Sequence, residues 1–411
     1  MEKYLRLAWR NIWRNRRRSI LTISAIAFAI LIVAVTRSLQ YGTYDTMERL
    51  AVRLYNGEIQ IQRAGFQEEQ TLAYFLHQDA ADWAQLVATN PELTGFSRRI
   101  TGFGLVSSDS SSAGALIVGI EPGRECEITQ FVTLVKEGDR LAPGDDRRVL
   151  LGVTLARNLQ VGVGDTVVVL TQGYRNQMGA DTYLVKGTVG MGNAELERGL
   201  LIMPLHNAQE LFSLYDGITQ VVVSTTDFRK ANSRAKRLMA LLADQRIAVL
   251  SWEQLMPELK QLIIIDNVSG AIYLIFLLVV VGFEIFNATM MNVMERTREF
   301  AILESMGMKP KQIAGLILLE SAMKITMAVL TGLAVSIVAI SILIQHPIPL
   351  GKEITDAYAS YGFSIEDLKF SGRLRVFLEP TISLAIIAVI ALIFPVYHTI
   401  KLSPMEAFRK G

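Results

Sequence analysis

The chain has 411 residues, of which 51% are hydrophobic and 19% are charged, and its mean hydropathy is +0.32. The charged share is below the roughly 25% of ordinary soluble domains, so the composition argues against a purely soluble protein. A formal net charge of +2 gives no reason to expect nucleic-acid binding, and the single cysteine, Cys126, excludes an internal disulfide.

The N-terminal segment, residues 1–18, is strongly basic. It contains seven Lys or Arg residues and one acid, Glu2. Because short segments rich in Lys and Arg stay in the cytoplasm, we expect residues 1–18 to form a cytoplasmic amphipathic helix before the first membrane span. Trp9 and Trp13 lie four residues apart, on one face of that helix, as expected at a membrane interface.

Four long apolar segments follow. A hydrocarbon core of about 30 Å requires roughly 20 apolar residues in a helix, because no water is present to satisfy the backbone. A buried core helix is the alternative for any one segment, and a cleaved signal peptide is another for the first. Four such segments in one chain favour a multi-pass membrane protein. The predicted spans are 19–41, 263–294, 313–345 and 379–400.

Residues 42–262 form a long insertion between the first two spans, on the extracytoplasmic side. About 220 residues are enough for a folded domain with its own core. The stretch 57–62 alternates as a half-buried strand does, and later stretches alternate strand, helix and strand, so we predict an α+β domain. Helical patterns over 37–56 and 251–267 predict stalks that connect it to the spans. A second, shorter extracytoplasmic loop is predicted over 346–378.

The sequence lacks the short motifs of common catalytic and nucleotide-binding sites. It contains no GxxxxGK[ST] phosphate loop, no GxSxG elbow and no HExxH zinc motif. The four histidines are scattered without the spacing of metal ligands: His77, His206, His346 and His398. We therefore expect no enzyme activity, no cofactor and no metal site in this chain.

A charged segment, residues 295–312, lies between the second and third spans. Its apolar residues recur at three- and four-residue steps, which predicts a helix with one face to dock and one face in water. These residues are Phe300, Ile302, Leu303 and Met306. Gly307 is expected to end this helix, and Pro310 to begin the next one. With four spans, this segment and the tail 401–411 are cytoplasmic. We expect this segment to be a contact site for a soluble partner. The alternative is that it only connects the two spans and is surrounded by water.

This segment resembles the coupling region of the ABC transporter permeases typified by MacB, FtsX and the lipoprotein-releasing Lol proteins. "ERTREFAILESMGMKPKQI" is similar to their E-R-x-x-E-[FI]-[AG]-I-L-x-x-x-G pattern and to the x-x-Q-I start of their third span. The tail "IKLSPMEAFRKG" and the turn "LARNLQVGVGDTVVV" are also similar to family patterns, and "SWEQLMPELKQLI" resembles the Lol branch most. The resemblance extends over essentially the whole chain.

The resemblance implies a fold, a location and a set of partners. The fold is an α-helical membrane protein with four transmembrane helices and a large MacB-like periplasmic α+β domain, in the bacterial inner membrane. Expected partners are a second permease, identical or paralogous, and two copies of a cytoplasmic ATPase that holds the ATP and Mg. The expected substrate is a lipoprotein, with membrane lipid and a periplasmic chaperone or adaptor as further partners. Alternatives are efflux of peptides, antibiotics or other amphiphiles, and FtsX-like signalling to a cell-wall hydrolase.

The resemblance also carries over residues that would couple the chain to the ATPase. Seven of them match the family pattern: Glu295, Arg296, Glu299, Ala301, Ile302, Leu303 and Gly307. Four more from the same segment complete the candidate set: Arg298, Phe300, Met306 and Met308.

Three charged residues lie inside or close to the predicted spans: Glu284, Glu320 and Lys324. A charge within the bilayer costs several kcal/mol unless it is paired or hydrated, so each is a functional candidate. Counting residues from the connecting segment places Glu284 and Lys324 at similar depths on antiparallel spans, and we expect them to pair. Glu320, four residues before Lys324, is the competing partner on the same helix. Snorkelling of either charge, or misplaced span boundaries, is the remaining alternative.

Overall fold

The computed structural model describes residues 2–192, 194–242, 244–355 and 367–401. The chain divides into two compact units. The membrane unit comprises residues 1–44, 263–348 and 367–411, and the sheet unit comprises residues 45–262 and 349–366. The predicted cytoplasmic tail beyond residue 401 and residues 356–366 of the predicted loop lie outside the described residues.

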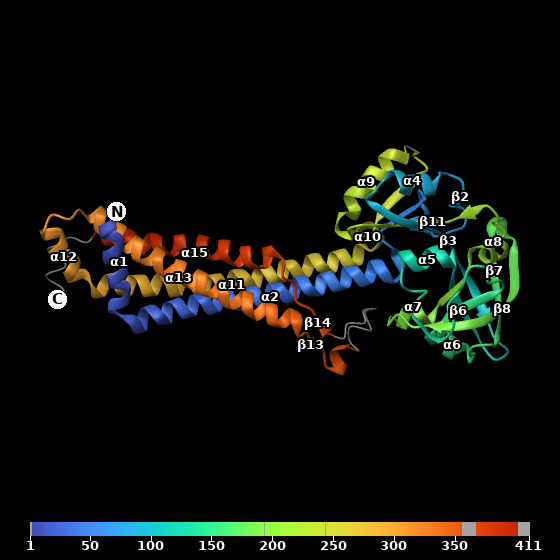
Figure 1. The fold of residues 1–411 in the computed structure, drawn as a ribbon, viewed down its shortest axis with the longest axis horizontal. Coiled ribbons are helices and arrows are strands. Elements are labelled where there is room, and N and C mark those ends of the chain that lie inside the picture. The colour runs from blue at the N-terminus through green and yellow to red at the C-terminus, as the bar shows by residue number, and fades with distance from the viewer. Residues whose placement is uncertain (1, 193, 243, 356–366, 402–411) are drawn as a thin grey trace. The chain divides into compact units, whose positions relative to one another are not determined.

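The membrane unit is built from long helices (Figure 1). Their bounds are α1 Glu2–Arg14, α2 Arg16–Ala51, α11 Pro257–Glu295, α12 Thr297–Ser305, α13 Pro310–Gln345 and α15 Leu374–Lys401. In the described part of the chain, four helical segments are long and apolar enough to cross a membrane: Arg16–Asn56, Pro257–Glu295, Pro310–Gln345 and Leu374–Ile400. Two short strands, β13 (Ile348–Pro349) and β14 (Asp367–Leu368), pair with each other.

The four long helices share one apolar core. It contains Ile30 of α2, Ile285 of α11, Ala328 of α13 and Leu384 of α15, all buried. Close packing and small residues hold helices together in a bilayer, where burial from water is no longer the driving force. Gly332 of α13 provides one such contact, because a Cβ there would lie 3.0 Å from the carbonyl oxygen of Ala27 in α2.

The sheet unit contains one ten-stranded mixed sheet (Figure 1). The strand order is β12-β1-β11-β3-β4-β9-β6-β8-β5, and β7 pairs with both β3 and β8. The pairs β4–β9 and β6–β8 are parallel, and the other described pairs are antiparallel. The strand bounds are β1 Ile59–Arg63, β3 Leu93–Ser107, β4 Ser112–Ile120, β5 Val135–Gly138, β6 Arg148–Gly152, β7 Thr166–Gln172, β8 Met178–Val189, β9 Leu200–Pro204, β11 Gln220–Thr225 and β12 Ile247–Ser251. A separate pair is β2 Leu76–His77 with β10 Gly217–Ile218.

Short helices cover this sheet. Their bounds are α3 Phe66–Glu69, α4 Trp83–Thr89, α5 Pro122–Ile128, α6 Val153–Leu159, α7 Ala194–Arg198, α8 Leu205–Leu211, α9 Ala231–Leu242 and α10 Trp252–Leu255. Single turns are η1 Val52–Asn56, η2 Tyr174–Asn176 and η3 Phe228–Lys230, of which η1 is a π-helix. The strand predicted at 57–62 corresponds to β1, but it is buried on both faces rather than half-buried, with Gln60 and Gln62 buried as well as Ile59 and Ile61. Asp227 caps η3 and accepts a hydrogen bond from the Arg229 N–H. The predicted fold class, four apolar helices with a large α+β domain, is confirmed.

A buried ion pair ties the end of the first stalk to the sheet. Arg99 of β3 and Glu125 of α5 are both fully buried, with 2.5 Å between Nη2 and Oε1. Arg99 Nη1 also donates to the carbonyl oxygen of Tyr55, in η1, at 2.7 Å. The turn that follows α2 is therefore held to the sheet by a charged group rather than by apolar packing alone.

Candidate coupling site

The segment between the second and third spans folds as a short helix set off by two breaks. α11 ends at Glu295, and α12 begins at Thr297, after a non-helical Arg296. Gly307 ends α12 in the left-handed region with φ 94°, which costs glycine little because it has no Cβ. The Met308 N–H then donates to the Leu303 carbonyl, as in a glycine-ended helix, and α13 begins at Pro310. The ends predicted from Gly307 and Pro310 are those of the structure.

The inner face of α12 packs on the ends of the neighbouring helices. Phe300 is buried against Val293 of α11 and Ile313 of α13, and Leu303 and Met308 contact the same cluster. Ala301 is buried as well. This contact fixes which side of α12 faces the rest of the membrane unit.

Arg296, in the break between α11 and α12, is the polar centre of the site. It is 7% exposed, and its Nη1 lies 2.9 Å from Oε2 of Glu320 in α13. Its Nε donates to Glu299 of α12 at 2.9 Å, and its guanidinium lies over the Phe300 ring at 5.1 Å. One side chain thus connects the end of α11 to both α12 and α13.

Glu320 is 1% exposed and has further partners. The side-chain amide of Asn11, in α1, donates to Oε1 at 2.6 Å, and that of Asn292, in α11, donates to Oε2 at 3.5 Å. A buried carboxylate needs such donors, because burial without them costs far more than the Coulomb attraction of one pair returns. The sequence predicts only Lys324 as a partner of Glu320, and the structure adds Arg296 and Asn11.

The predicted pair of Glu284 with Lys324 is not formed in this structure. Glu284 is exposed on α11, and no ion pair joins it to Lys324 within the part of the chain that the structure describes. Lys324 is half-buried, one helical turn beyond Glu320, with which it has an electrostatic interaction. Glu284 is exposed whereas Lys324 interacts with Glu320, and counting residues along the chain gives the depth of a residue but not the side of the helix on which it lies.

The N-terminal helix also contacts the coupling segment. Arg14 of α1 lies 2.8 Å from Glu299, and Arg18 of α2 lies 2.7 Å from Glu295. Burial raises the pKa of Glu299, but hydrogen bonds from Arg296 and Arg14 outweigh it and leave that pKa below its ordinary value. Exposed pairs of this kind contribute little stability each. The first pair joins α1 to α12, and the second joins α2 to the end of α11. The excess of Arg in residues 1–18 predicts the cytoplasmic side of the membrane, but it does not by itself predict this contact.

The outer face of α12 is open. Arg298 is exposed, Ile302 is 48% exposed and Met306 is 79% exposed, and these residues follow one another at four-residue steps. The sequence grouped Phe300, Leu303, Ile302 and Met306 on one docking face. The structure separates them: Phe300 and Leu303 pack inward, and Ile302 and Met306 face outward. The remaining candidate residue, Glu295, is exposed at the end of α11.

The described chain combines four helices that are long and apolar enough to cross a membrane, a large sheet domain inserted after the first of them, and a short helix packed between the second and the third. This is the arrangement of a multi-pass membrane protein. Its sequence matches the family described as FtsX-like permease C-terminal over residues 271–404, and the MacB-like periplasmic core domain over residues 19–240. The second match alone covers more than half of the chain. The chain belongs to the MacB/FtsX family of ABC transporter permeases.

Similar proteins include members with an assigned role. The lipoprotein-releasing system transmembrane protein LolC of Xylella fastidiosa is 24% identical over 344 residues, which cover 80% of this chain and 81% of that protein. An uncharacterized ABC transporter permease of Methanocaldococcus jannaschii is 21% identical and covers 100% of this chain and 98% of its own length. Among solved structures, the periplasmic region of MacB from Actinobacillus actinomycetemcomitans is 14% identical with a TM-score of 0.36, covering 53% of this chain and 98% of that one.

Proposed function

We propose that this permease receives force from a separate cytoplasmic ATPase at α12 and uses it to release lipoproteins from the bacterial inner membrane. In this proposal both termini and α12 lie in the cytoplasm, the sheet unit lies in the periplasm, and a second permease completes the transporter. Two ATPase copies bind the nucleotide and Mg. The LolC relatives support the substrate, and the basic N-terminal segment supports the orientation.

The bracing of α12 is the observation that carries the proposal. Phe300 packs between α11 and α13, and Arg296 links the same two helices through Glu320. A side chain that binds three elements in a buried network resists sliding of one element past another. A push on the outer face of α12 is therefore passed to both spans, whereas a solvated connector would absorb it.

The outer face has the composition of a docking surface. Met and Arg are enriched in protein interfaces relative to the rest of a surface. Ile302 and Met306 expose apolar area beside the exposed Arg298. Ile302 lies in α12 and Met306 directly follows its last residue, so both can insert into a groove on a partner.

The physics of the substrate explains why such a machine requires ATP. Burial of lipid is worth about 0.8 kcal/mol per CH₂, so three acyl chains of roughly 15 carbons cost on the order of 35 kcal/mol to expose. Spontaneous release cannot supply that free energy. A movement driven by ATP, along an apolar path that keeps the acyl chains out of water, can meet this requirement.

The proposal is tested by disrupting only the outer face. We expect the variant Ile302→Asp/Met306→Asp to lose co-purification with its ATPase and to lose ATP-dependent release of a triacylated lipoprotein from proteoliposomes. The matched control is Met239→Asp, at an exposed methionine of α9 in the sheet unit, which should retain both activities. Retention of ATPase binding and release by the double variant would reject α12 as the docking site.

A second candidate function is export of another amphiphile. The relative from Methanocaldococcus jannaschii matches the whole chain, and its name gives the permease class without a substrate, so this match supports transport but does not favour lipoproteins. The same proteoliposomes separate the two functions. ATPase stimulation by an amphiphilic peptide or antibiotic, without release of lipoprotein, would favour the second one.

A further inference from the structure

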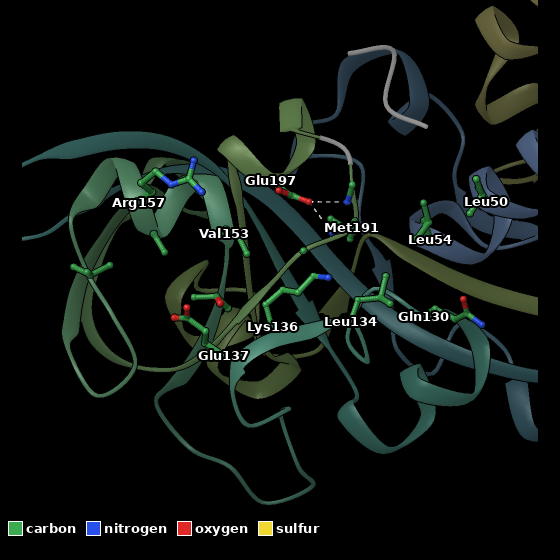
Figure 2. Close-up of a pocket in the computed structure, with 15 residues that line it drawn as sticks. Leu50, Leu54, Gln130, Leu134, Lys136, Glu137, Val153, Arg157, Met191 and Glu197 are labelled. Carbon is green, nitrogen blue, oxygen red and sulfur yellow. Dashed lines mark hydrogen bonds between the residues drawn. The ribbon is translucent and has the colours of Figure 1, made fainter. Parts of the chain in front are cut away.

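A pocket in the sheet unit lies beside the turn that joins the first stalk to the sheet. Its volume is about 730 Å³, within the range of roughly 300–1,000 Å³ that small-molecule sites occupy. Figure 2 shows its lining, to which the end of α2, the turn η1, β5 and α6 contribute.

One side of the pocket is mostly apolar, with Gln130 as the polar side chain labelled among its residues (Figure 2). Leu50 of α2 and Leu54 of η1 face Leu134 and Met191, and Val153 of α6 continues the wall. Leu54, Leu134 and Met191 also belong to or pack against the main core of the sheet unit, so these walls are fixed by packing. An aliphatic chain is the ligand that such a wall accommodates.

Lys136 brings a positive charge to the same pocket. It lies in β5 where the pairing with β8 shifts register between Val135 and Glu137, which is the signature of a β-bulge. A bulge redirects a side chain, and bulges are frequent beside functional sites. The Lys136 stem lies across Gly190, where a Cβ would come within 2.8 Å of its Cε. Glycine at this position therefore leaves room for the lysine to lie along the pocket (Figure 2).

The charges around the pocket leave Lys136 open to an anion. Within the described residues no ion pair joins Lys136 or Arg157 to an acid. Glu197 is buried, and its Oε1 already accepts from the backbone N–H groups of Met191 at 2.6 Å and Gly192 at 2.8 Å (Figure 2). Glu137 is exposed, and in Figure 2 it points away from the Lys136 amino group.

We propose that this pocket binds an amphiphile with one aliphatic chain and an anionic group, the chain against Leu50, Leu54 and Met191 and the anion on Lys136. Because Leu50 and Leu54 belong to the stalk, the ligand contacts the stalk and the sheet together. The ligand class follows from the pocket. The proposal that the protein encounters such a ligand during transport rests on the proposed function. A binding experiment requires neither ATP nor an ATPase, so the two proposals can fail separately.

The test uses the full chain in nanodiscs of phosphatidylcholine, with a photoreactive C12 carboxylic acid as the probe. We expect crosslinks to peptides that contain Leu54, Leu134 and Met191, and competition by laurate and dodecyl phosphate but not by dodecylamine. If lysophosphatidylglycerol also competes, the natural ligand is a membrane lipid. If it does not compete, the natural ligand is a free acid. Crosslinks confined to the membrane-spanning helices would overturn the proposal.

Variants of Lys136 separate binding from folding. Lys136→Met should lower labelling by up to about fivefold, because Lys136 is exposed and solvent weakens an exposed ion pair. Lys136→Arg should retain labelling, and Lys136→Glu should transfer the preference to a photoreactive C12 amine. The matched control is Lys236→Met, at an exposed lysine of α9, which should label as the wild type does. Equal labelling of wild type, Lys136→Met and Lys136→Glu would show that the lysine does not recognise the ligand.

Discussion

Arg296 and Glu320 form a buried ion pair across 24 positions of sequence, with 2.9 Å between Nη1 and Oε2. The pair exists because α11 ends one residue before Arg296 and α13 runs back past it. Asn11 donates to the same carboxylate from the N-terminal helix. Helix α1, helix α11 and the break before α12 therefore all bond to one carboxylate of α13. Arg296 joins this carboxylate to α12 through Glu299.

The first prediction concerns removal of one partner. Arg296→Met should destabilise the membrane unit by about 3–5 kcal/mol, because Glu320 is left buried without its cation. Arg296→Met/Glu320→Gln should recover most of that loss, since the neutral amide still accepts from Asn11. Unfolding of the purified chain in detergent micelles measures both effects.

The control for this prediction is Arg298→Met. Arg298 is exposed, so its loss should change stability by no more than about 0.5 kcal/mol while weakening ATPase binding. If the single and double variants at Arg296 and Glu320 proved equally unstable, the pair would not be the source of the stability.

The second prediction compares neighbouring arginines of β3. Arg99→Met leaves the fully buried Glu125 without its cation and should cost about 3–5 kcal/mol. Arg98→Met breaks a pair with Glu121 that is partly open to solvent and should cost about 1 kcal/mol or less. Hydrogen exchange at Val52–Asn56 should also accelerate only in Arg99→Met, because only Arg99 bonds the Tyr55 carbonyl. Unchanged exchange at this turn in Arg99→Met would mean that the turn is held by apolar packing alone.

The sequence was informative where structure is local. Alternation at Ile59 and Ile61 predicted β1, and Gly307 and Pro310 predicted where α12 ends and α13 begins. The sequence was also informative about the class of protein, because residues 295–307 resemble the pattern of the permease family to which the chain belongs.

The remaining features depend on contacts between distant residues. Asn11 is 309 positions from Glu320, and no periodicity connects them. The helical steps placed Phe300 and Ile302 in one broad apolar arc, and only the contact with Ile313 decides that Phe300 faces inward. The direction of Lys136 follows from a register shift against β8, which the sequence of β5 alone does not encode.

The third prediction is a pH dependence centred on Glu125. Burial raises the pKa of this carboxyl, but Arg99 and the hydroxyl groups of Thr129 and Ser97 outweigh it, so the pKa is below its ordinary value in the folded chain. The unfolded chain then binds more protons between the two pKa values. The pair's stabilisation is complete above the unfolded pKa of about 4.3 and is lost as the pH falls through the folded value.

Denaturant unfolding from pH 7 to pH 3 measures this dependence. We expect a flat region above pH 5 and a decline below about pH 4.3 that is shallower in Glu125→Gln. Asp145, whose pKa is also lowered in the folded chain, keeps a smaller decline in that variant. Parallel curves for wild type and Glu125→Gln would show that Glu125 does not titrate with unfolding.

The last prediction uses two glycines of α13. A Cβ at Gly332 would lie 3.0 Å from the Ala27 carbonyl oxygen and 3.0 Å from Cβ of Ile30, whereas a Cβ at Gly315 meets no heavy atom within 4 Å. Gly315→Ala should therefore be neutral or stabilising by up to about 1 kcal/mol, from helix propensity alone. Gly332→Leu must separate α13 from α2 and should cost about 1–3 kcal/mol through overpacking. Thermal unfolding in detergent checks both values. If the Gly332→Leu variant were as stable as a Gly315→Leu variant, α13 and α2 could move apart without loss of stability. A force applied at α12 would then not be transmitted from α13 to α2 by direct contact.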